Sequence, residues 1–450
     1  SIVILAAGQG KRMNSELPKV LQPLAGRSLL SHVIDCAEGV GADDICVVYG
    51  HGGDEVRAAF ADTDLRWALQ AEQRGTGHAV QQAMPETPDD NRVVVMFGDV
   101  PLLKPGTVRK LVDHCENDDV AVLTVVTDNP CGYGRIVRDN GNVVRNVEEC
   151  DATDEEKAIT EINTGVLCGP ARSLKTWLGR LSNDNSQGEY YLTDVLGVAV
   201  ADGATVHGVI TDDQAEVMGI NDKRQLAQAE RALQERRVNE LLDQGVTFAD
   251  PARVDIRGEL DCGRDVFIDV NVVFEGKVTL GDNVRVEMNN LLRDSSIGEG
   301  SCIHPNCHIE RSTMGRDCEI GPFSRLRPEA ALADRVKIGN FVEVKKSRIS
   351  DGSKVNHLSY VGDTIIGTGV NVGAGTITCN YDGANKHQTT IGDGAFIGSG
   401  VELVAPVEIG AGATIGAGST ISKSAPGGKL TLERARQVTI PGWKAPVKKP

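Results

Sequence analysis

Residues 391–421 read IGDGAFIGSGVELVAPVEIGAGATIGAGSTI, and an aliphatic side chain recurs at every sixth position. The six positions are Ile391, Ile397, Leu403, Ile409, Ile415 and Ile421, and a glycine follows four of them. A period of six matches neither the 3.6-residue repeat of a helix nor the two-residue alternation of a strand. It is typical of a parallel β-helix, in which a coil of about 18 residues has three short strands and the coils stack around an aliphatic ladder.

The repeat extends toward the N-terminus from this stretch. Ile366, Val372 and Thr378 keep the same phase, and weaker copies occur at 278–284 and 297–303. The register breaks between Thr378 and Ile391, so we expect 379–388 to form a loop that projects from one corner. The alternative, a glycine-rich linker, does not account for aliphatic residues that stay in register over six repeats.

The first 221 residues have a different pattern, in which short apolar runs alternate with amphipathic stretches. This alternation predicts βα units with a largely parallel sheet that is covered on both faces. Such sheets bind ligands beyond the carboxyl ends of their strands. The expected strands are 2–5, 45–49, 93–97 and 120–126, and the expected helices include 29–38 and 77–84.

Between these two regions, Leu226, Ala229, Leu233 and Leu241 recur at near-helical spacing among charged residues, and Gly245 is a stop signal. We therefore predict an α/β domain over 1–221, a helical linker over 222–245 and a β-helix over 246–450.

Composition and charge exclude several classes of function. The net charge of −16 arises within 1–221, and 222–450 is neutral. The acidic half is therefore not expected to bind nucleic acid. No apolar run approaches the ~20 residues of a membrane span, and no signal peptide is visible. The eleven cysteines include no Cys-x-x-Cys pair, which fits reduced thiols and a cytoplasmic protein.

The C-terminal tail is basic, with seven Lys or Arg residues after Ile421 against a single acidic residue, Glu433. It is either a solvated tail or a contact for an anionic ligand.

A candidate phosphate site follows the first strand. Gly8 and Gly10 let backbone N–H groups approach a phosphate, while Arg12 and Lys19 supply cations. Asp99, at the end of the strand 93–97, could hold Mg²⁺, and the polar loop 70–77 could bind a base. From the residues alone, a plain strand-to-helix turn with solvated charges remains open.

A second candidate site lies among polar residues within the repeat. His357 stands beside Asn356, Ser359 and Tyr360. Imidazole titrates near neutral pH, so His357 could accept a proton from an attacking amine. By itself, a structural histidine is the alternative.

Longer motifs narrow these possibilities. Leu-Ala-Ala-Gly-x-Gly-x-Arg-Met, Leu-Pro-Lys, Gln-x-x-x-x-Gly-Thr-Gly-His and Gly-Asp-x-Pro-Leu resemble the sugar-phosphate nucleotidyltransferases. The six-residue repeats resemble the left-handed β-helix acyltransferases. Together they resemble, over essentially the whole chain, the bacterial bifunctional N-acetylglucosamine-1-phosphate uridyltransferases / glucosamine-1-phosphate acetyltransferases.

The resemblance implies two successive reactions. Acetyl-CoA acetylates glucosamine-1-phosphate, and UTP then uridylates N-acetylglucosamine-1-phosphate with release of pyrophosphate. Mg²⁺ is the implied metal, and the assembly is a homotrimer whose acetyltransferase sites are shared between chains. The product, UDP-N-acetylglucosamine, feeds peptidoglycan and lipopolysaccharide synthesis.

Residue roles in the uridyltransferase site also follow from the resemblance. Arg12 and Lys19 would neutralise the triphosphate, and Asp99 and Asn221 would bind Mg²⁺. The nucleotide and the sugar would contact residues from the motifs and from scattered positions: Leu5, Ala6, Ala7, Gly8, Lys19, Gln70, Gly75, Thr76, Phe97, Gly98, Asp99, Gly134, Glu148, Asn163 and Asn221.

In the acetyltransferase site, His357 would be the general base. The residues implied for the amino sugar and its phosphate are Arg327, Lys345, Tyr360, Asn371, Asn380 and Tyr381. Those implied for acetyl-CoA are Ala374, Ser399, Ala417 and Arg434.

The chain departs from the family pattern at three positions. Lys11 replaces the usual Thr, Phe97 replaces a frequent Tyr, and Glu329 replaces the Gly of Arg-Pro-Gly. The last change puts the local loop geometry in doubt.

Two other functions are compatible with parts of this pattern: a single-function nucleotidyltransferase with a structural β-helix, and a regulatory subunit without activity. The presence of the His357 cluster argues against the first, and Arg12, Lys19 and Asp99 argue against the second.

Overall fold

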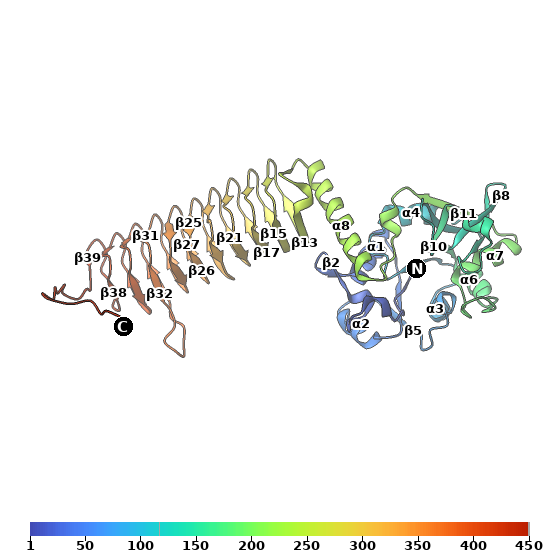
Figure 1. Ribbon diagram of the computed structural model, residues 1–450, viewed down its shortest axis with the longest axis horizontal. Helices are drawn as coiled ribbons and strands as arrows, with labels where there is room; N and C mark the ends of the chain where they lie inside the picture. The colour runs from blue at the N-terminus through green and yellow to red at the C-terminus, as the bar shows by residue number, and fades with distance from the viewer. Residues whose placement is uncertain (117, 449–450) are drawn as a thin grey trace. The chain divides into compact units, whose positions relative to one another are not determined.

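The computed structural model describes residues 1–116 and 118–448, and these form two compact units (Figure 1). The first unit ends at Leu233 and the second begins at Gln234. This boundary falls within the predicted linker, inside helix α8 (Lys223–Asp243). In the first unit, Leu233 is buried in a small apolar cluster, whereas Val238 belongs to the core of the second. The predicted helix is confirmed, and each half of it contributes to the core of its own unit.

The first unit is built on a mixed sheet with strand order β11-β7-β10-β6-β1-β4-β5. β1 pairs in parallel with β4 and β6, whereas β10 runs antiparallel to β6 and β7, and the hairpin β8–β9 extends from β10. The strands are β1 (Ile2–Leu5), β4 (Ile45–Tyr49), β5 (Arg66–Leu69), β6 (Arg92–Phe97), β7 (Val120–Val126), β8 (Arg135–Asp139), β9 (Asn142–Val147), β10 (Glu161–Pro170) and β11 (Val206–Thr211), with a separate ribbon of β2 (Pro23–Leu24) and β3 (Arg27–Ser28).

Helices cover both faces of this sheet. Successive side chains of a strand point to opposite faces, so Ile4 belongs to one core cluster and Leu5 to the other. α1, α2 and α4 pack in the first cluster, and α3, α6 and α7 pack in the second. The helices are α1 (Leu29–Val40), α2 (Gly53–Ala59), α3 (Thr76–Ala83), α4 (Pro105–Asp113), α5 (Asp154–Lys157), α6 (Ala171–Leu178) and α7 (Val195–Ala201).

The second unit is a left-handed parallel β-helix. β28, β29 and β30 make one coil, after which β31 lies on β28. One ladder consists of β12 (Thr247–Phe248), β14 (Phe267–Ile268), β16 (Arg285–Val286), β19 (Cys302–Ile303), β22 (Glu319–Ile320), β25 (Lys337–Asn340), β28 (Lys354–His357), β31 (Asn371–Val372), β34 (Phe396–Ile397), β37 (Thr414–Ile415) and β39 (Leu430–Thr431).

The remaining strands cover the other sides of the coil and pair in parallel with their counterparts on the neighbouring coils. They are β13 (Val254–Cys262), β15 (Val272–Leu280), β17 (Leu291–Arg293), β18 (Ser296–Ile297), β20 (His308–Glu310), β21 (Thr313–Met314), β23 (Arg325–Leu326), β24 (Ala330–Leu332), β26 (Glu343–Lys345), β27 (Ser347–Ile349), β29 (Tyr360–Gly362), β30 (Thr364–Ile366), β32 (Ile377–Cys379), β33 (Thr389–Ile391), β35 (Glu402–Val404), β36 (Val407–Ile409) and β38 (Thr420–Ile421).

The predicted aliphatic ladder forms the core of this unit. All six residues of the repeat between Ile391 and Ile421 are buried, as are Ile366, Val372 and Thr378. The coils are slightly less regular than expected, because Val286 lies beside Ile303, 17 residues on, and Ile320 lies beside Ile338, 18 residues on.

The predicted insertion is confirmed as a loop between β32 and β33 that projects from the β-helix (Figure 1). Ile366 pairs with Ile391 across it, and an antiparallel bridge between Tyr381 and Lys386 closes the loop. Among the described residues, no helix of either unit is long and apolar enough to cross a bilayer.

One column of corner residues has positive φ, including Arg311 (43°), Glu329 (66°) and Lys346 (45°). Such angles favour glycine, because the Cβ of other residues crowds the following carbonyl group. The family glycine that Glu329 replaces therefore coincides with a left-handed backbone conformation.

We predict that Glu329→Gly raises the free energy of unfolding by about 0.5–1 kcal/mol, which is the ~1–2 kcal/mol left-handed penalty less the greater entropy of an unfolded glycine. Urea unfolding followed by circular dichroism measures this change. Glu329→Ala retains the Cβ and serves as the control. A glycine variant no more stable than the alanine variant would show that Glu329 is not strained.

Candidate active sites in the two units

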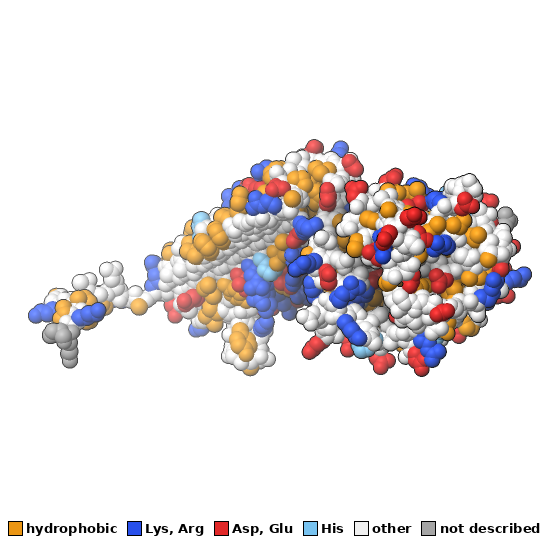
Figure 2. Space-filling view, turned by 45° about the vertical axis from the view of Figure 1, so that its right-hand side comes forward, with side chains coloured by type: hydrophobic (Ala, Val, Ile, Leu, Met, Phe, Trp, Pro, Cys, Tyr) orange, Lys and Arg blue, Asp and Glu red, His pale blue; other side chains and the backbone are white. Residues whose placement is uncertain are grey.

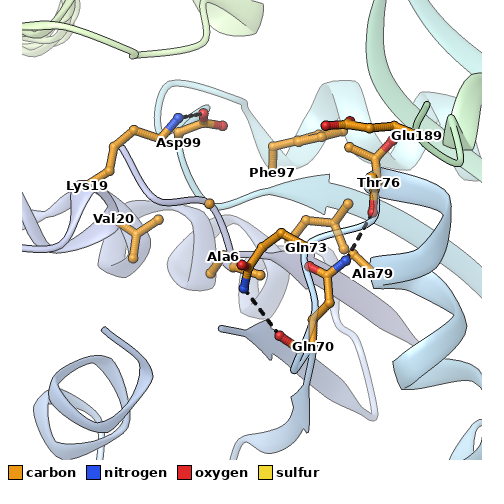
Figure 3. Close-up of a pocket in the computed structure, with 14 residues that line it drawn as sticks. Ala6, Lys19, Val20, Gln70, Gln73, Thr76, Ala79, Phe97, Asp99 and Glu189 are labelled. Carbon is orange, nitrogen blue, oxygen red and sulfur yellow. Dashed lines mark hydrogen bonds and ion pairs between the residues drawn. The ribbon is translucent and has the colours of Figure 1, made fainter. Parts of the chain in front are cut away.

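The first unit contains a cavity of about 210 Å³ at the carboxyl ends of β1 and β6 (Figure 3). Most of the predicted nucleotide residues line it, namely Leu5, Ala6, Ala7, Gly8, Lys19, Gln70, Gly75, Thr76, Phe97 and Asp99. Four other residues also line it: Gln73, from the polar loop 70–77 that was expected to bind a base, and Val20, Ala79 and Glu189, which the sequence reasoning did not single out.

A cation and two oxygen donors meet at one side of this cavity. The ammonium group of Lys19 forms an ion pair with the Asp99 carboxylate and donates to Asn221 Oδ1 at 3.1 Å. The backbone N–H of Ile220 donates to the Asp99 carbonyl at 2.9 Å, which fixes the Asn221 segment beside Asp99. Carboxylate and amide oxygens are the ligands that Mg²⁺ prefers. Here the oxygens of Asp99 and Asn221 already face the positive charge of the Lys19 ammonium group. The residues present therefore fit a divalent cation.

Polar groups of the β5–α3 loop line the other side (Figure 3). Gln70 is buried and donates from Nε2 to the Gly75 carbonyl at 3.1 Å, and Gln73 Nε2 donates to the Gln70 carbonyl at 3.4 Å. Gly75 has a φ of 109°, and a Cβ there would lie 2.6 Å from the Tyr190 carbonyl oxygen. This loop is therefore held closely against a second segment, with amide groups near the cavity.

The glycine-rich loop borders the same cavity. A Cβ at Gly8 would meet nothing within 4 Å, so the backbone there is open to a ligand. Gly10 has a φ of 60° and lies against Lys19, where a Cβ would be 2.7 Å from the Lys19 Cβ. Arg12 is exposed on the 3₁₀ turn 11–13 and does not line the cavity, and Gly98 lies behind its wall against Val20.

Three of the four residues implied for the sugar, Gly134, Glu148 and Asn163, form a connected group, whereas the fourth, Asn221, lies beside Lys19. The backbone N–H of Asn163 donates to the Gly134 carbonyl at 2.9 Å, and Asn146 Nδ2 donates to Glu148 Oε1 at 2.8 Å. A Cβ at Gly134 would lie 2.5 Å from Asn146 Oδ1, so Gly134 allows this close packing. The structure thus brings Gly134, Glu148 and Asn163 together through Asn146, which the sequence reasoning missed.

Several polar side chains near Glu148 are buried from water, and some of them lack hydrogen-bond partners. In the described part of the chain, Asn146 Oδ1 and Tyr191 Oη are buried without a hydrogen-bond partner. Burial, together with the charges of Glu148 and Asp151, raises the pKa of Asp194 to about 6. Such groups suit a ligand rich in hydroxyl groups, which can donate to them.

In the second unit, basic side chains gather on the β-helix next to the projecting loop (Figure 2). Arg327 and Lys345 lie on successive coils because β23 pairs with β26 in register, and Lys386 reaches them from the loop. Contact with Lys386 lowers the pKa of the Lys345 ammonium group. Crowded cations of this kind fit an anionic ligand. Lys386 lies in the insertion, where the six-residue period gives no signal, so the sequence reasoning missed it.

Two of the predicted neutral polar residues, Tyr360 and Asn380, lie close to each other near these cations. A side chain at Gly362 would collide with the Tyr360 hydroxyl and the Asn380 amide, so Gly362 lets those two groups approach each other. Asn380 is buried and donates to Asp363 Oδ2 at 2.6 Å. The predicted Tyr381 lies apart, exposed on the loop, with its hydroxyl donating to the Gly383 carbonyl at 2.6 Å. Asn371 is half-buried on β31.

His357 is the first of a column of predicted residues that lie at one corner of successive coils of the β-helix. Its Nδ1 lies 2.8 Å from Asn340 Oδ1, one coil earlier. Because an amide oxygen can only accept, Nδ1 carries the proton and the lone pair of Nε2 is left for another partner. Asn340 was not foreseen, although it stands in register with His357 one coil earlier.

Small residues continue the column. The N–H groups of Gly375, Gly400 and Gly418 donate to the carbonyls of His357, Ala374 and Ser399, respectively. Ala417 follows in the next coil, since a Cβ at Gly398 would lie 2.5 Å from its backbone nitrogen. Arg434, on the tail, lies at the far end, with its Cδ 3.8 Å from a Cβ placed at Gly418. The predicted residues Ala374, Ser399, Ala417 and Arg434 therefore share one edge with His357.

Comparison with known proteins matches both units. The model of the MobA-like NTP transferase domain matches residues 2–247, and that of the bacterial transferase hexapeptide (six repeats) matches residues 388–423. The chain is 56% identical over 449 residues to the bifunctional protein GlmU of Aromatoleum aromaticum, which covers 100% of this chain and 99% of that protein. The chain belongs to the GlmU family.

Other members of the family are similarly close. The GlmU proteins of an Azoarcus species and of Herminiimonas arsenicoxydans are 56% and 53% identical, over 99% and 100% of this chain and 99% of each protein. Membership confirms the expected bifunctional transferase, with a nucleotidyltransferase and an acetyltransferase on one chain. It also argues against the two alternatives, a single-function nucleotidyltransferase with a structural β-helix and a regulatory subunit without activity.

Proposed function

We propose that unit 2 acetylates glucosamine-1-phosphate with acetyl-CoA and that unit 1 joins the product to UTP. The convergence of Lys19, Asp99 and Asn221 at the cavity carries this assignment for unit 1. Both reactants of the uridyl transfer are anions, so the protein must neutralise charge and hold the attacking and leaving groups in line.

Lys19 and Arg12 would neutralise the phosphates of UTP. Asp99 and Asn221 would hold Mg²⁺, which supplies further positive charge to the phosphate oxygens when bound. The sugar-phosphate oxygen attacks the α-phosphorus of UTP, the bond to the pyrophosphate oxygen breaks, and pyrophosphate leaves. This displacement requires no nucleophile from the protein.

The two ends of the cavity would bind different parts of the nucleotide. Uridine would contact Leu5–Gly8, Gln70, Gly75 and Thr76. Gln73 also lines the cavity, and its side-chain amide adds a second amide group that can bind the base. The sugar would lie toward Gly134, Glu148, Asn163 and Asn146, where the buried Asn146 Oδ1 lacks a donor.

In unit 2, His357 would act as the general base. Asn340 supports this role, because it orients the ring and leaves Nε2 without a proton. The amino nitrogen attacks the thioester carbonyl carbon, Nε2 takes the proton of the amine, and the C–S bond breaks to release CoA. Arg327, Lys345 and Lys386 would bind the sugar phosphate, with Tyr360, Asn371 and Asn380 around the sugar and Tyr381 on the projecting loop.

Acetyl-CoA would lie along the corner column. Ala374, Ser399 and Ala417 have small side chains, so a long flexible ligand can approach the backbone there. Arg434 would meet the anionic end of the cofactor, on a tail that carries several basic side chains (Figure 2). This arrangement favours the anion-contact interpretation of the tail over a merely solvated one.

The protein would assemble as a homotrimer, with parts of the acetyltransferase site completed by a neighbouring chain. Phe323 and Phe341 stack at 5.3 Å on one corner, where they are 51% and 54% exposed, and Leu358 continues the column at 61%. An exposed apolar column of this kind favours burial against another chain. No disulfide joins the eleven cysteines, all of which lie in the described part of the chain, and this supports a cytoplasmic location.

We predict that Asp99→Ala abolishes uridyl transfer from UTP to N-acetylglucosamine-1-phosphate and leaves acetylation unchanged, because the residues of the two sites belong to different units. Separate assays of pyrophosphate and CoA release measure the two activities. Asp64→Ala, which removes an exposed carboxylate of the same unit, is the matched control. Full uridyl transfer by the Asp99 variant would exclude Asp99 from the mechanism.

His357→Ala should lower acetylation by ~10²–10⁴-fold, the usual contribution of a positioned base, while acetyl-CoA binding and uridyl transfer persist. Asn340→Ala should cause a smaller loss, because the base remains but is no longer oriented. If the His357 variant acetylates within a fewfold of the wild-type rate, another group takes the proton of the amine, and Tyr360 and Glu343 are the nearest candidates.

Light scattering at micromolar concentration should give three times the chain mass of 47.9 kDa. Phe341→Lys should shift the protein toward smaller species, because it places a charge in the apolar column. A wild-type monomer would contradict the trimer.

A further inference from the structure

Three potential metal ligands converge on one side of the β-helix, among coils that precede the acetyltransferase residues. Cys302 and His304 flank the buried Ile303, so both side chains point outward on the same side. Glu287 lies one coil earlier beside His304, because Val286 pairs with Ile303. The backbone N–H of Glu287 donates to the Ile303 carbonyl at 2.9 Å, which fixes this register.

Two of the three distances between donor atoms are close to the edges of a tetrahedral site. His304 Nδ1 lies 3.2 Å from Glu287 Oε2 and 3.8 Å from Cys302 Sγ, and ligand atoms of all three residues lie within 4.8 Å of one another. Tetrahedral zinc, with Zn–N and Zn–O of about 2.0–2.1 Å and Zn–S of about 2.3 Å, requires edges of about 3.3 Å and 3.5 Å for the same pairs. The three side chains thus need little movement to share one ion.

We propose that Glu287, Cys302 and His304 bind a borderline-soft divalent cation of the zinc class, with water as the fourth ligand. A thiolate, a carboxylate and a neutral imidazole carry two negative charges, which balance such an ion. This donor set differs from the all-oxygen pair Asp99 and Asn221, which suits a hard cation.

Neighbouring residues support this geometry. Arg285 Nε donates to Glu287 Oε1 at 3.3 Å, and its guanidinium carbon lies 4.2 Å from the ring centroid of Phe267. Arg285 therefore holds Glu287 Oε1 in place, so that Oε2 faces His304. Residues that hydrogen-bond to metal ligands orient them in the same way. Glu319 is in register with Cys302 on the next coil, and its Oε1 accepts a hydrogen bond from Lys337 Nζ at 2.7 Å. Because this carboxylate is already paired, water is left as the fourth ligand of the ion.

The test is a titration of the full-length protein with Co²⁺, a spectroscopic substitute for Zn²⁺. A thiolate ligand gives a charge-transfer band in the near ultraviolet, which the all-oxygen Asp99 site cannot produce. We expect the band to saturate at one Co²⁺ per chain and to be displaced by Zn²⁺. Cys302→Ser should abolish it, and His304→Ala and Glu287→Gln should each weaken Co²⁺ binding by at least the ~10–100-fold that loss of an outer partner costs.

Cys262→Ser is the matched control, because Cys262 is also a partly buried thiol of the β-helix. It should retain the band, and circular dichroism should show that every variant keeps its fold. The proposal is overturned if wild type gives no band, if the band persists in Cys302→Ser, or if half-saturation lies in the millimolar range, which would mean an adventitious ion only.

Discussion

Parallel stacking of one coil on the next, at a spacing of about 4.8 Å, is the constraint on which the second unit depends. It places residues 17 or 18 apart side by side, as in the pairs Val286–Ile303 and Ile320–Ile338. The aliphatic members of this register form the core. The same register brings Asn340 beside His357 and aligns Arg327 with Lys345, so the outward positions can form sites without any further folding of the chain.

In the first unit, the strand order has the equivalent role. β1 lies between β4 and β6, so the glycine-rich loop and Asp99 emerge side by side at the carboxyl ends of neighbouring strands. Asn221 comes from much later in the chain and reaches Asp99 through the bond between Ile220 N–H and the Asp99 carbonyl. Lys19, Asp99 and Asn221 therefore meet from three separate segments of the chain, so their arrangement requires the complete domain.

Much of the fold could be predicted because its signals are periodic. The six-residue repeat gave the β-helix and its inward residues, and alternating apolar runs gave the main strands. The antiparallel entry of β10 was not foreseen, since pairing direction depends on partners distant in sequence. For the sites, motif residues such as Lys19 and Gln70 and the polar loop that contains Gln73 were found, whereas Asn340 and Lys386 were missed. Asn340 and Lys386 matter through contacts between coils and with a loop, and no local pattern marks them.

The central claim is that two independent active sites on one chain act in sequence through a diffusible intermediate. The most direct measurement supplies glucosamine-1-phosphate, acetyl-CoA, UTP and Mg²⁺ to a mixture of the Asp99→Ala and His357→Ala proteins and follows UDP-N-acetylglucosamine. We expect each variant alone to form little or no product and the mixture to form it readily, because each protein supplies the step the other lacks. A mixture as inactive as its components would exclude a diffusible intermediate passed between the two sites.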